Sequence, residues 1–381
     1  MIYKLRQNLL NSMRKIFLIT ERRADYSRFK PILELIQQDI ELDYDLVVTG
    51  MHLKEEHGST INEIIKDGFK IFSKFEMFME VEDSGAAMVR SFGECVKKVT
   101  FELDKSNPDI ILSGFDIAAN FAVTIAGAHM NIPVAHIQGG EVTGTIDESI
   151  RHAMSKFAHY HFAANQDAKD RLIKLGEIPQ HIFNVGCPSI DAILKVSDNP
   201  DILKKYDLGD NFYIVLQHPV TTEIEQSSNQ ILKTIDAVIE SQIEAIIVLP
   251  NNDAGFSKIM ENIKNSKLKF VETLSIDDYV NLLKRSSGLI GNSSSGIHET
   301  ATFNIPTINI GTRQQGRLRS NNVIDVNYDK DEIINAINQS KVMKGKDFNK
   351  IYGFGDSSEK IVKLLKTLDI SDKIIQKQIT Y

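Results

Sequence analysis

The sequence has few cysteines and no long apolar run, and these two absences exclude several classes of protein. Its 381 residues include only Cys95 and Cys187, which are too few for a disulfide framework or a zinc site built from several thiolates. No apolar run approaches the ~20 residues that a membrane-spanning helix needs. We therefore expect a protein of the reducing cytoplasm that has no membrane partner.

The N-terminal stretch lacks the features of a signal peptide. Its letters MIYKLRQNLLNS contain no long apolar core and no small-residue cleavage site. Their amphipathic pattern favours an appended arm, residues 1–12, ahead of the first domain. Translation that starts at Met13 instead of Met1 is the alternative.

The chain also lacks a run of basic residues. Its formal net charge is −7, so we expect no nucleic-acid partner. An anionic ligand would need local arginines or backbone N–H groups to overcome the repulsion from this net negative charge. The hydrophobic content of 42% and the charged content of 25% are normal for a globular protein. The length fits two domains, because single cores stop growing at roughly 250–300 residues.

Short apolar runs alternate with helical patterns along most of the chain. Nearly continuous β-branched runs between helices are typical of parallel strands covered on both faces. Two such series predict two doubly wound, Rossmann-like α/β domains that face a central cleft. The polar stretch at 197–210 separates them, so we expect domains at 13–197 and at 198–381, the second with C-terminal helices. The predicted strands are 15–20, 45–49, 109–112, 133–137, 161–164, 182–185, 212–216, 245–249, 268–271, 288–290 and 307–310.

Polar residues are crowded between the strand at 133–137 and the helix that follows it. Gly139 and Gly140 allow a sharp turn after the strand. Thr145, with Glu148 three residues later, has the pattern of a capping box at the start of a helix. An apolar stripe then follows at helical spacing, and it consists of Ile146, Ile150, Ala153 and Phe157.

The opposite stripe of this helix is polar. We interpret Ser155 and His159 as a solvated face, whereas Glu148 stands in the first turn, at the mouth of the strand, where a cleft is expected. A metal site from His152 and His159 is disfavoured, because they are seven residues apart and no third ligand is evident nearby. We therefore expect no metal.

No glycine-rich dinucleotide fingerprint follows the first strand. In its place the letters TERRADYSR offer Arg22 and Arg23, and a guanidinium can hold a phosphate through two hydrogen bonds. A pair of surface arginines is the alternative interpretation. Asp116, just after the strand at 109–112, is equally suited to catalysis and to capping the next helix.

Three loops at strand ends of the second half are suited to anions. His218 directly follows the first strand of that half, so its imidazole should face the cleft. The letters GNSSSGIHE, residues 291–299, place small residues at a helix start, where backbone N–H groups can bind an anion. Glu299 should lie one to two turns into that helix, within reach of ribose hydroxyls, although an ordinary serine-rich cap is the alternative. With Arg313 and Arg317 in the next loop, the pattern predicts a nucleotide-sugar ligand.

Together these motifs resemble the hydrolysing UDP-N-acetylglucosamine 2-epimerases. The resemblance implies a GT-B fold, the nucleotide in the cleft, no cofactor and a homodimer or homotetramer. It also implies conversion of UDP-N-acetylglucosamine and water to N-acetylmannosamine and UDP, the first step toward sialic acid. A sister branch acts on UDP-2,4-diacetamido-2,4,6-trideoxyglucose for legionaminic acid. The resemblance extends from about residue 14 to about residue 368, through RADYS, HIQGGEVTGTIDESIRHAMSKFAHYHF, GCPSIDAIL, LQHPVTT, PNNDAG, GNSSSGIHE and GTRQQGR.

The resemblance implies roles for the residues that match its motifs. Contacts with the UDP part are implied for Arg23, Ser27, His218, Asn251, Ser293, Ser294, Glu299 and Arg313. Proton transfer at the sugar is implied for Asp116 and Glu148, with Gln138 and Glu141 in the same segment.

Two positions depart from the family pattern. Ile117 stands where the family usually has arginine after the first acid, and Gln138 stands where it commonly has glutamate. Since a glutamine cannot act as a general base, we expect Glu141 or Glu148 to supply one, and the predicted cap favours Glu148. A GT-B glycosyltransferase and a non-catalytic nucleotide-sugar sensor are the alternative functions.

Overall fold

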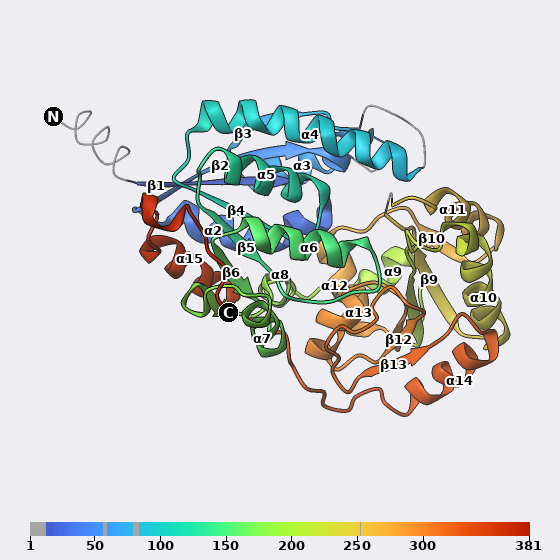
Figure 1. The fold of residues 1–381 in the computed structure, drawn as a ribbon. Helices are drawn as coiled ribbons and strands as arrows, with labels where there is room; N and C mark the ends of the chain where they lie inside the picture. The colour runs from blue at the N-terminus through green and yellow to red at the C-terminus, as the bar shows by residue number, and fades with distance from the viewer. Residues whose placement is uncertain (1–12, 56–58, 79–83, 252) are drawn as a thin grey trace.

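The computed structural model describes residues 13–55, 59–78, 84–251 and 253–381, which form two parallel β-sheets with helices packed around them (Figure 1). The predicted arm, 1–12, lies outside the described residues. The first sheet has the order β3-β2-β1-β4-β5-β6-β7 and the second has the order β10-β9-β8-β11-β12-β13. Strand order reverses between β1 and β4 and again between β8 and β11. Doubly wound sheets bind ligands at such switch points.

Every strand pair in the described chain is parallel. The sequence predicts neither β3 nor β13, because these edge strands, IFSKF and VIDV, are partly exposed and each contains a charged residue. The strands of the first sheet are β1 (Arg14–Thr20), β2 (Leu42–Thr49), β3 (Ile71–Phe75), β4 (Ile110–Gly114), β5 (Val134–Ile137), β6 (Tyr160–Ala163) and β7 (Ile182–Asn184). Those of the second are β8 (Phe212–Leu216), β9 (Glu244–Val248), β10 (Lys269–Val271), β11 (Gly288–Gly291), β12 (Thr307–Ile310) and β13 (Val323–Val326).

Helices connect most of the successive strands, and several begin at a side-chain cap. Ser84 accepts a hydrogen bond from the N–H of Ala87 at 3.2 Å and so caps the longest described helix. No described helix is long and apolar enough to cross a membrane. The helices are α2 (Arg23–Gln38), α3 (Ile61–Lys66), α4 (Gly85–Ser106), α5 (Ala118–His129), α6 (Ile146–Phe157), α7 (Gln166–Lys174), α8 (Pro188–Leu194), α9 (Ile202–Tyr206), α10 (Ser227–Glu240), α11 (Phe256–Asn265), α12 (Ile276–Arg285), α13 (Ser295–His298), α14 (Lys330–Lys341) and α15 (Ser357–Thr367).

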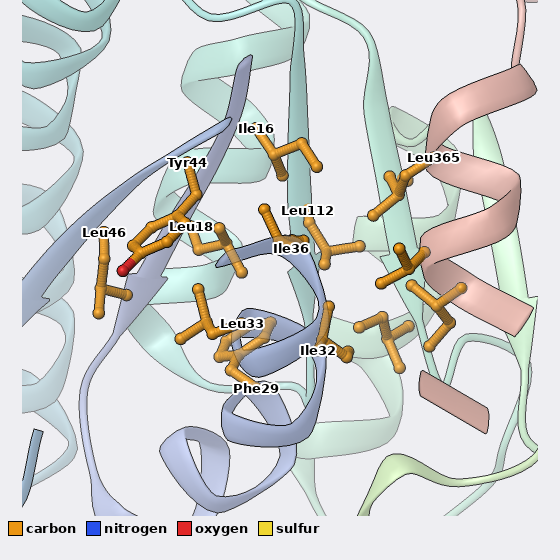
Figure 2. Packing of buried hydrophobic residues seen from close by; sticks show 14 of the residues in the cluster. Ile16, Leu18, Phe29, Ile32, Leu33, Ile36, Tyr44, Leu46, Leu112 and Leu365 are labelled. Atoms are coloured by element: carbon orange, nitrogen blue, oxygen red, sulfur yellow. The ribbon is translucent and has the colours of Figure 1, made fainter. Parts of the chain in front are cut away.

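The last helix, α15, packs against the first sheet. Figure 2 shows Leu365 in the same cluster as Ile16 and Leu112, and all three side chains are fully buried. The Tyr160 hydroxyl also donates a hydrogen bond to the carbonyl oxygen of Asp369 at 2.7 Å. The predicted second domain, 198–381, therefore needs a correction, because its last helix completes the core of the first domain.

The end of the chain covers the face of α6 that the sequence analysis assigns to solvent. Lys377 Nζ donates to the carbonyl oxygen of Ser155 at 2.8 Å and pairs with Glu177 at 2.6 Å. His159 Nε2 lies 3.2 Å from the carbonyl oxygen of Ile375. Ser155 and His159 are consequently buried, and the prediction of a solvated face is wrong because the covering segment is distant in sequence.

Candidate functional site

Two connected cavities lie where loops at the carboxyl ends of the two sheets meet. The serine-lined cavity, of about 340 Å³, is lined by Ser293 and Ser294 among other residues. The acid-lined cavity, of about 220 Å³, is lined by Asp116 and Asp147 among other residues. The residues common to both cavities form a junction, which consists of Arg22, Ala24, Arg28, His218, Asn251, Ser293 and Ser294.

The cavities bring together most of the residues that the sequence predicts as a site. The serine-lined cavity contains Arg23, Ser27, His218, Asn251, Ser293, Ser294 and Glu299. The acid-lined cavity contains Asp116, Gln138, Glu141, His218, Asn251, Ser293, Ser294 and Arg313. Glu148 lines neither of them. Within the described chain, no three histidine, cysteine or carboxylate side chains are grouped as metal ligands.

A buried carboxylate shapes the loop that follows β1. Asp25 accepts hydrogen bonds from the backbone N–H groups of Glu21, Arg22 and Tyr26, each at 2.9 Å. Burial raises the pKa of Asp25 to about 6. Arg22 pairs with Glu21 at 2.6 Å and, across the cleft, lies 3.5 Å from Asp253. The loop thus fixes one guanidinium between the two domains.

Arg23 is already held by protein groups. Its Nε donates to Glu63 at 3.1 Å, and its Nη1 donates to the Thr273 hydroxyl and to the carbonyl oxygen of Leu274 in the opposite domain. These contacts tie the domains together at the edge of the serine-lined cavity. They leave Arg23 less free for a phosphate than the sequence analysis expects.

Arg28 is the guanidinium that remains available at the junction. It lies 5.1 Å over the ring of Phe115, and among the described residues no hydrogen bond or ion pair holds it. Sequence reasoning missed Arg28, although it follows Ala24 by one helical turn and Ala24 lines both cavities. Its position suits an anion that spans the two cavities.

His218 is held as a neutral imidazole. Its Nδ1 accepts from the N–H of Asn251 at 3.2 Å, and its own backbone N–H donates to Asn292 Oδ1 at 2.7 Å. Burial, together with the charge of Arg313, lowers the pKa of His218 to about 3. With Nδ1 as acceptor, the assigned tautomer carries its proton on Nε2. A donor is therefore available to a ligand oxygen.

The serine loop ends in a shorter helix than the sequence predicts. Ser293 and Ser294 precede α13, which spans four residues, so Glu299 follows the end of this helix and does not lie deep within it. The Ser295 hydroxyl donates to the Glu299 carboxylate at 2.6 Å. Burial raises the pKa of Glu299, and this carboxyl lines the serine-lined cavity.

A strained turn places Asp116 at the end of β4. Phe115 and Asp116 have φ values of 69° and 48°, a region that residues other than glycine seldom adopt. The turn directs the Asp116 carboxylate to Arg151, with which it forms an ion pair. Arg151 is almost fully buried and also donates to the carbonyl oxygen of Glu141 at 3.1 Å.

Asp147 is a further acid of this cavity, and sequence reasoning did not identify it. The Thr145 hydroxyl, which caps α6, accepts from the N–H of Asp147 at 3.3 Å. Burial and the neighbouring Asp116 carboxylate raise the pKa of Asp147. Arg313 approaches it from the other domain at 3.8 Å. Asp116 and Asp147 therefore lie in one cavity but in different electrostatic environments.

Glu148 does not form the predicted capping box. Its carboxylate accepts from the N–H of Thr143 at 2.7 Å and lies 3.8 Å from His152. The cap of α6 instead consists of Thr145 and the N–H of Asp147. The capping-box prediction is wrong because the preceding loop folds back onto the helix start and takes the Glu148 side chain away from the cleft.

Glu141 joins the two domains. Its Oε2 atom accepts from Arg317 at 2.9 Å and lies 3.3 Å from His298 Nε2. Burial alone would raise the pKa of Glu141, but Arg317 and His298 hold it well below its usual range. The same loop donates the N–H of Gly144 to the carbonyl oxygen of Arg313 at 3.1 Å. Glu141 thus remains ionised and fixed.

Gln138 carries an unpaired acceptor into the acid-lined cavity. It is buried, has a φ of 61°, and its Oε1 has no partner within the described chain. The Thr143 hydroxyl is unpaired there as well. The glycine turn predicted after β5 is confirmed, since Gly140 has a φ of 82° and an added Cβ would lie 2.3 Å from the carbonyl oxygen of Ala168. Gln138 Oε1 and the Thr143 hydroxyl are therefore able to form further hydrogen bonds.

Comparison with known proteins shows the family of the chain. A family model for UDP-N-acetylglucosamine 2-epimerase matches residues 34–366. A UDP-N,N'-diacetylbacillosamine 2-epimerase (hydrolyzing) of Legionella pneumophila is 34% identical over 373 residues, which cover 96% of this chain and 99% of that protein. A UDP-N-acetylglucosamine 2-epimerase of Neisseria meningitidis is 33% identical over 334 residues, which cover 86% of this chain and 88% of that protein.

The solved structures show the same fold. The crystal structure of UDP-GlcNAc 2-epimerase from Neisseria meningitidis, bound to UDP-GlcNAc, matches with a TM-score of 0.78 at 18% identity. The match covers 92% of this chain and 99% of that one, and it confirms the predicted GT-B fold. The chain belongs to the UDP-N-acetylglucosamine 2-epimerase family.

Proposed function

We propose that this chain hydrolyses a UDP-linked 2-acetamido sugar and inverts carbon 2, so that it releases UDP and the free 2-epimer. The observation that carries the proposal is the pair Asp116 and Asp147, two carboxyl groups in one cavity whose environments differ. Pairs of this kind supply an acid and a base in one site. The adjoining junction offers Arg28 and the neutral His218 to a pyrophosphate.

The reaction divides into two stages. UDP departs from carbon 1 as a proton leaves carbon 2, which gives a glycal, and water then adds at carbon 1 as a proton returns to the other face of carbon 2. Arg28 and the Nε2–H of His218 stabilise the charge that develops on the leaving pyrophosphate. Asp116 and Asp147 exchange the protons. The atoms of the UDP-sugar and one water equal those of the free sugar and UDP, so the proposed reaction consumes no other reagent.

The remaining polar groups of the acid-lined cavity bind the sugar. Gln138 Oε1 accepts a hydrogen bond from a substrate N–H or O–H, and the Thr143 hydroxyl can donate or accept one. Glu141 stays ionised against Arg317 and holds the loop that carries these groups. In this proposal Asp147 has the proton-transfer role that the sequence analysis expects of Glu148, the next residue in the chain.

For the sugar itself we favour the 2,4-diacetamido-2,4,6-trideoxy form, which is N,N'-diacetylbacillosamine. One wall of the acid-lined cavity is apolar and consists of Met88, Ile117, Ile146 and Ile150. A methyl group at carbon 6 and an amide at carbon 4 suit this wall better than the two hydroxyls of N-acetylglucosamine. The Legionella pneumophila relative, whose name specifies that sugar, also matches 96% of the chain.

UDP-N-acetylglucosamine is the second candidate, because the Neisseria meningitidis relative is almost equally similar. With UDP-N-acetylglucosamine the product is N-acetylmannosamine, a precursor of sialic acid. With the diacetamido sugar the product is a precursor of legionaminic acid. Both substrates should be incubated with the protein side by side, and UDP and free sugar measured. We expect kcat/KM to be at least about tenfold higher for the diacetamido sugar.

Other outcomes of this assay decide between functions. A preference for UDP-N-acetylglucosamine would reverse the choice of sugar and keep the reaction. If the protein binds the UDP-sugar but releases neither UDP nor free sugar, it is a nucleotide-sugar sensor. Transfer of the sugar to an added acceptor would indicate a glycosyltransferase.

Two further expectations concern localisation and oligomeric state. Cys95 and Cys187 are buried and form no disulfide, which suits the cytoplasm. The homodimer or homotetramer stays a prediction that sedimentation velocity can test.

A further inference from the structure

A third cavity opens from the acid-lined cavity, and its walls are almost entirely apolar. This apolar cavity has a volume of about 480 Å³. It shares seven lining residues with the acid-lined cavity, so the two are continuous, and these are Arg22, Met88, Ala118, Ile146, Ile150, Thr221 and Asp253. Beyond these shared residues it is lined mainly by Met77, Phe78, Val89, Phe92, Phe121 and Ile224.

The apolar cavity adjoins mainly the acid-lined cavity. Among the described residues, Arg22 of the junction is the single one that lines both the apolar and the serine-lined cavities. In a pyranose ring, carbon 4 is opposite carbon 1. If carbon 1 lies at the pyrophosphate junction of Arg28 and His218, the carbon 4 substituent points toward the apolar cavity.

The polar residues at the mouth of the apolar cavity are Arg22, Asp253 and Thr221, and Thr221 is the uncharged one. Thr221 lines both cavities, and its buried hydroxyl has no partner among the described residues. A hydroxyl can donate to an amide oxygen or accept from an amide N–H. Behind it, the stacked rings of Phe92 and Phe121, 5.1 Å apart and 18° from parallel, form a flat apolar wall.

We propose that the apolar cavity binds the acyl chain of an amide at carbon 4 of the sugar, and that it accepts chains longer than acetyl. This inference rests on the proposed function, because it places carbon 1 at the junction. The Thr221 hydroxyl bonds the amide group, and the chain lies against Phe92, Phe121 and Ile150. An acetyl group alone would leave most of the apolar wall facing water.

The test compares UDP-2-acetamido-2,4,6-trideoxy sugars whose carbon 4 nitrogen carries acetyl, propanoyl or butanoyl. Each buried methylene should strengthen binding by about threefold to fourfold. Butanoyl should therefore give kcat/KM about tenfold above acetyl. Equilibrium affinity for the three sugars is measured in parallel by calorimetry with Asp147→Asn, so that binding can be read without turnover.

Two variants locate the effect in the apolar cavity. Val89 is 69% exposed on α4 and lines the apolar cavity, so Val89→Asp should fold and abolish the gain from longer chains. Phe101→Asp is the matched control, because Phe101 is 58% exposed on the same helix and lines none of the three cavities.

The possible results separate this inference from the proposed function. Equal or weaker binding of butanoyl than acetyl would overturn the inference and leave the reaction standing. Chain-length gains that persist in Val89→Asp would place the acyl chain elsewhere and also overturn it. If no sugar is turned over, the reaction fails, but tighter binding of butanoyl, lost only in Val89→Asp, would still support the apolar site.

Discussion

The junction of the two cavities and the rest of the acid-lined cavity differ in whether their charged side chains are already paired. At the junction, which both cavities share, Arg28 has no protein acceptor in the described chain and His218 is neutral, so donors remain free for an anion. In the acid-lined cavity, Asp116 and Glu141 are already paired with arginines. Asp147 lies 3.8 Å from Arg313, and burial and the Asp116 carboxylate raise its pKa. Free donors suit binding, and a carboxyl whose pKa is raised suits proton transfer.

The largest predicted effect concerns Asp147. Asp147→Asn removes the proton carrier but keeps the side-chain shape, so turnover should fall by about 10²–10⁴-fold. UDP affinity should stay within about threefold, because the contacts of the serine-lined cavity are intact. Steady-state rates and calorimetry with UDP measure the two quantities separately.

Glu148→Gln is the matched control for this change. Glu148 occupies the same turn of α6 but lines neither cavity, so its variant should keep turnover within about threefold. If Glu148→Gln is the inactive variant and Asp147→Asn remains active, the roles assigned to the two neighbours are reversed.

The next prediction distinguishes the two arginines that could bind the phosphates, Arg28 and Arg23. Arg28→Gln should weaken UDP binding at least about tenfold, since a hydrogen bond to a charged group contributes about 1.5–3 kcal/mol. Arg23→Gln should weaken it less, because Arg23 is already engaged by Glu63 and by the opposite domain. Calorimetry on both variants decides, and a larger loss in Arg23→Gln would restore the original sequence-based prediction.

A third prediction concerns Lys377, which anchors α6, the helix that carries Asp147. Lys377→Met removes a charged partner of Glu177 and the hydrogen bond to Ser155, and should lower unfolding free energy by about 1–2 kcal/mol at neutral pH. Burial opposes ionisation of Glu177, but His161 and Lys377 lower its pKa to about 2. Because the folded pKa is below the unfolded value of 4.5, this stability is present above pH 4.5 and lost as pH falls toward 2.

Denaturant titrations of both proteins between pH 7 and pH 2 test the anchor. The difference between wild type and Lys377→Met should shrink as Glu177 is protonated. A difference that stays constant over this range would show that the lysine stabilises the helix without the carboxylate.

The smallest effect concerns the neutral state of His218. Nitrogen-15 spectra of the unliganded protein should show the Nε2–H tautomer throughout pH 5–8, since the pKa is about 3. His218→Gln, which retains a neutral donor, should change UDP affinity by less than about threefold. A His218 signal that titrates near pH 6.5 would contradict the neutral assignment.

The sequence predicts the two sheets and the loops that form the junction, because buried parallel strands have a strong local pattern. It misses β3 and β13, whose edge positions leave polar residues within the strand. It also misses the return of α15 to the first core, because an amphipathic helix does not encode which sheet it will cover.

The candidate site was predictable by position but not by orientation. Asp147 and Glu148 are consecutive residues of α6, about 100° apart around its axis, and only the packing of α6 and its preceding loop decides which carboxyl lines the cavity. Arg28 was missed for the same reason, since the face of α2 that meets the cleft depends on the second domain. The predicted roles of Ser27, Asn251, Ser293 and Ser294 stay predictions.

The central claim is that the acid-lined cavity exchanges a proton at carbon 2 as UDP leaves. The most direct measurement is turnover of UDP-N,N'-diacetylbacillosamine in deuterated water, with the released sugar analysed by NMR and mass spectrometry. Wild type should release the inverted 2-epimer with one deuterium at carbon 2, and Asp147→Asn should release almost none. A released sugar that keeps its configuration and carries hydrogen at carbon 2 would contradict the account.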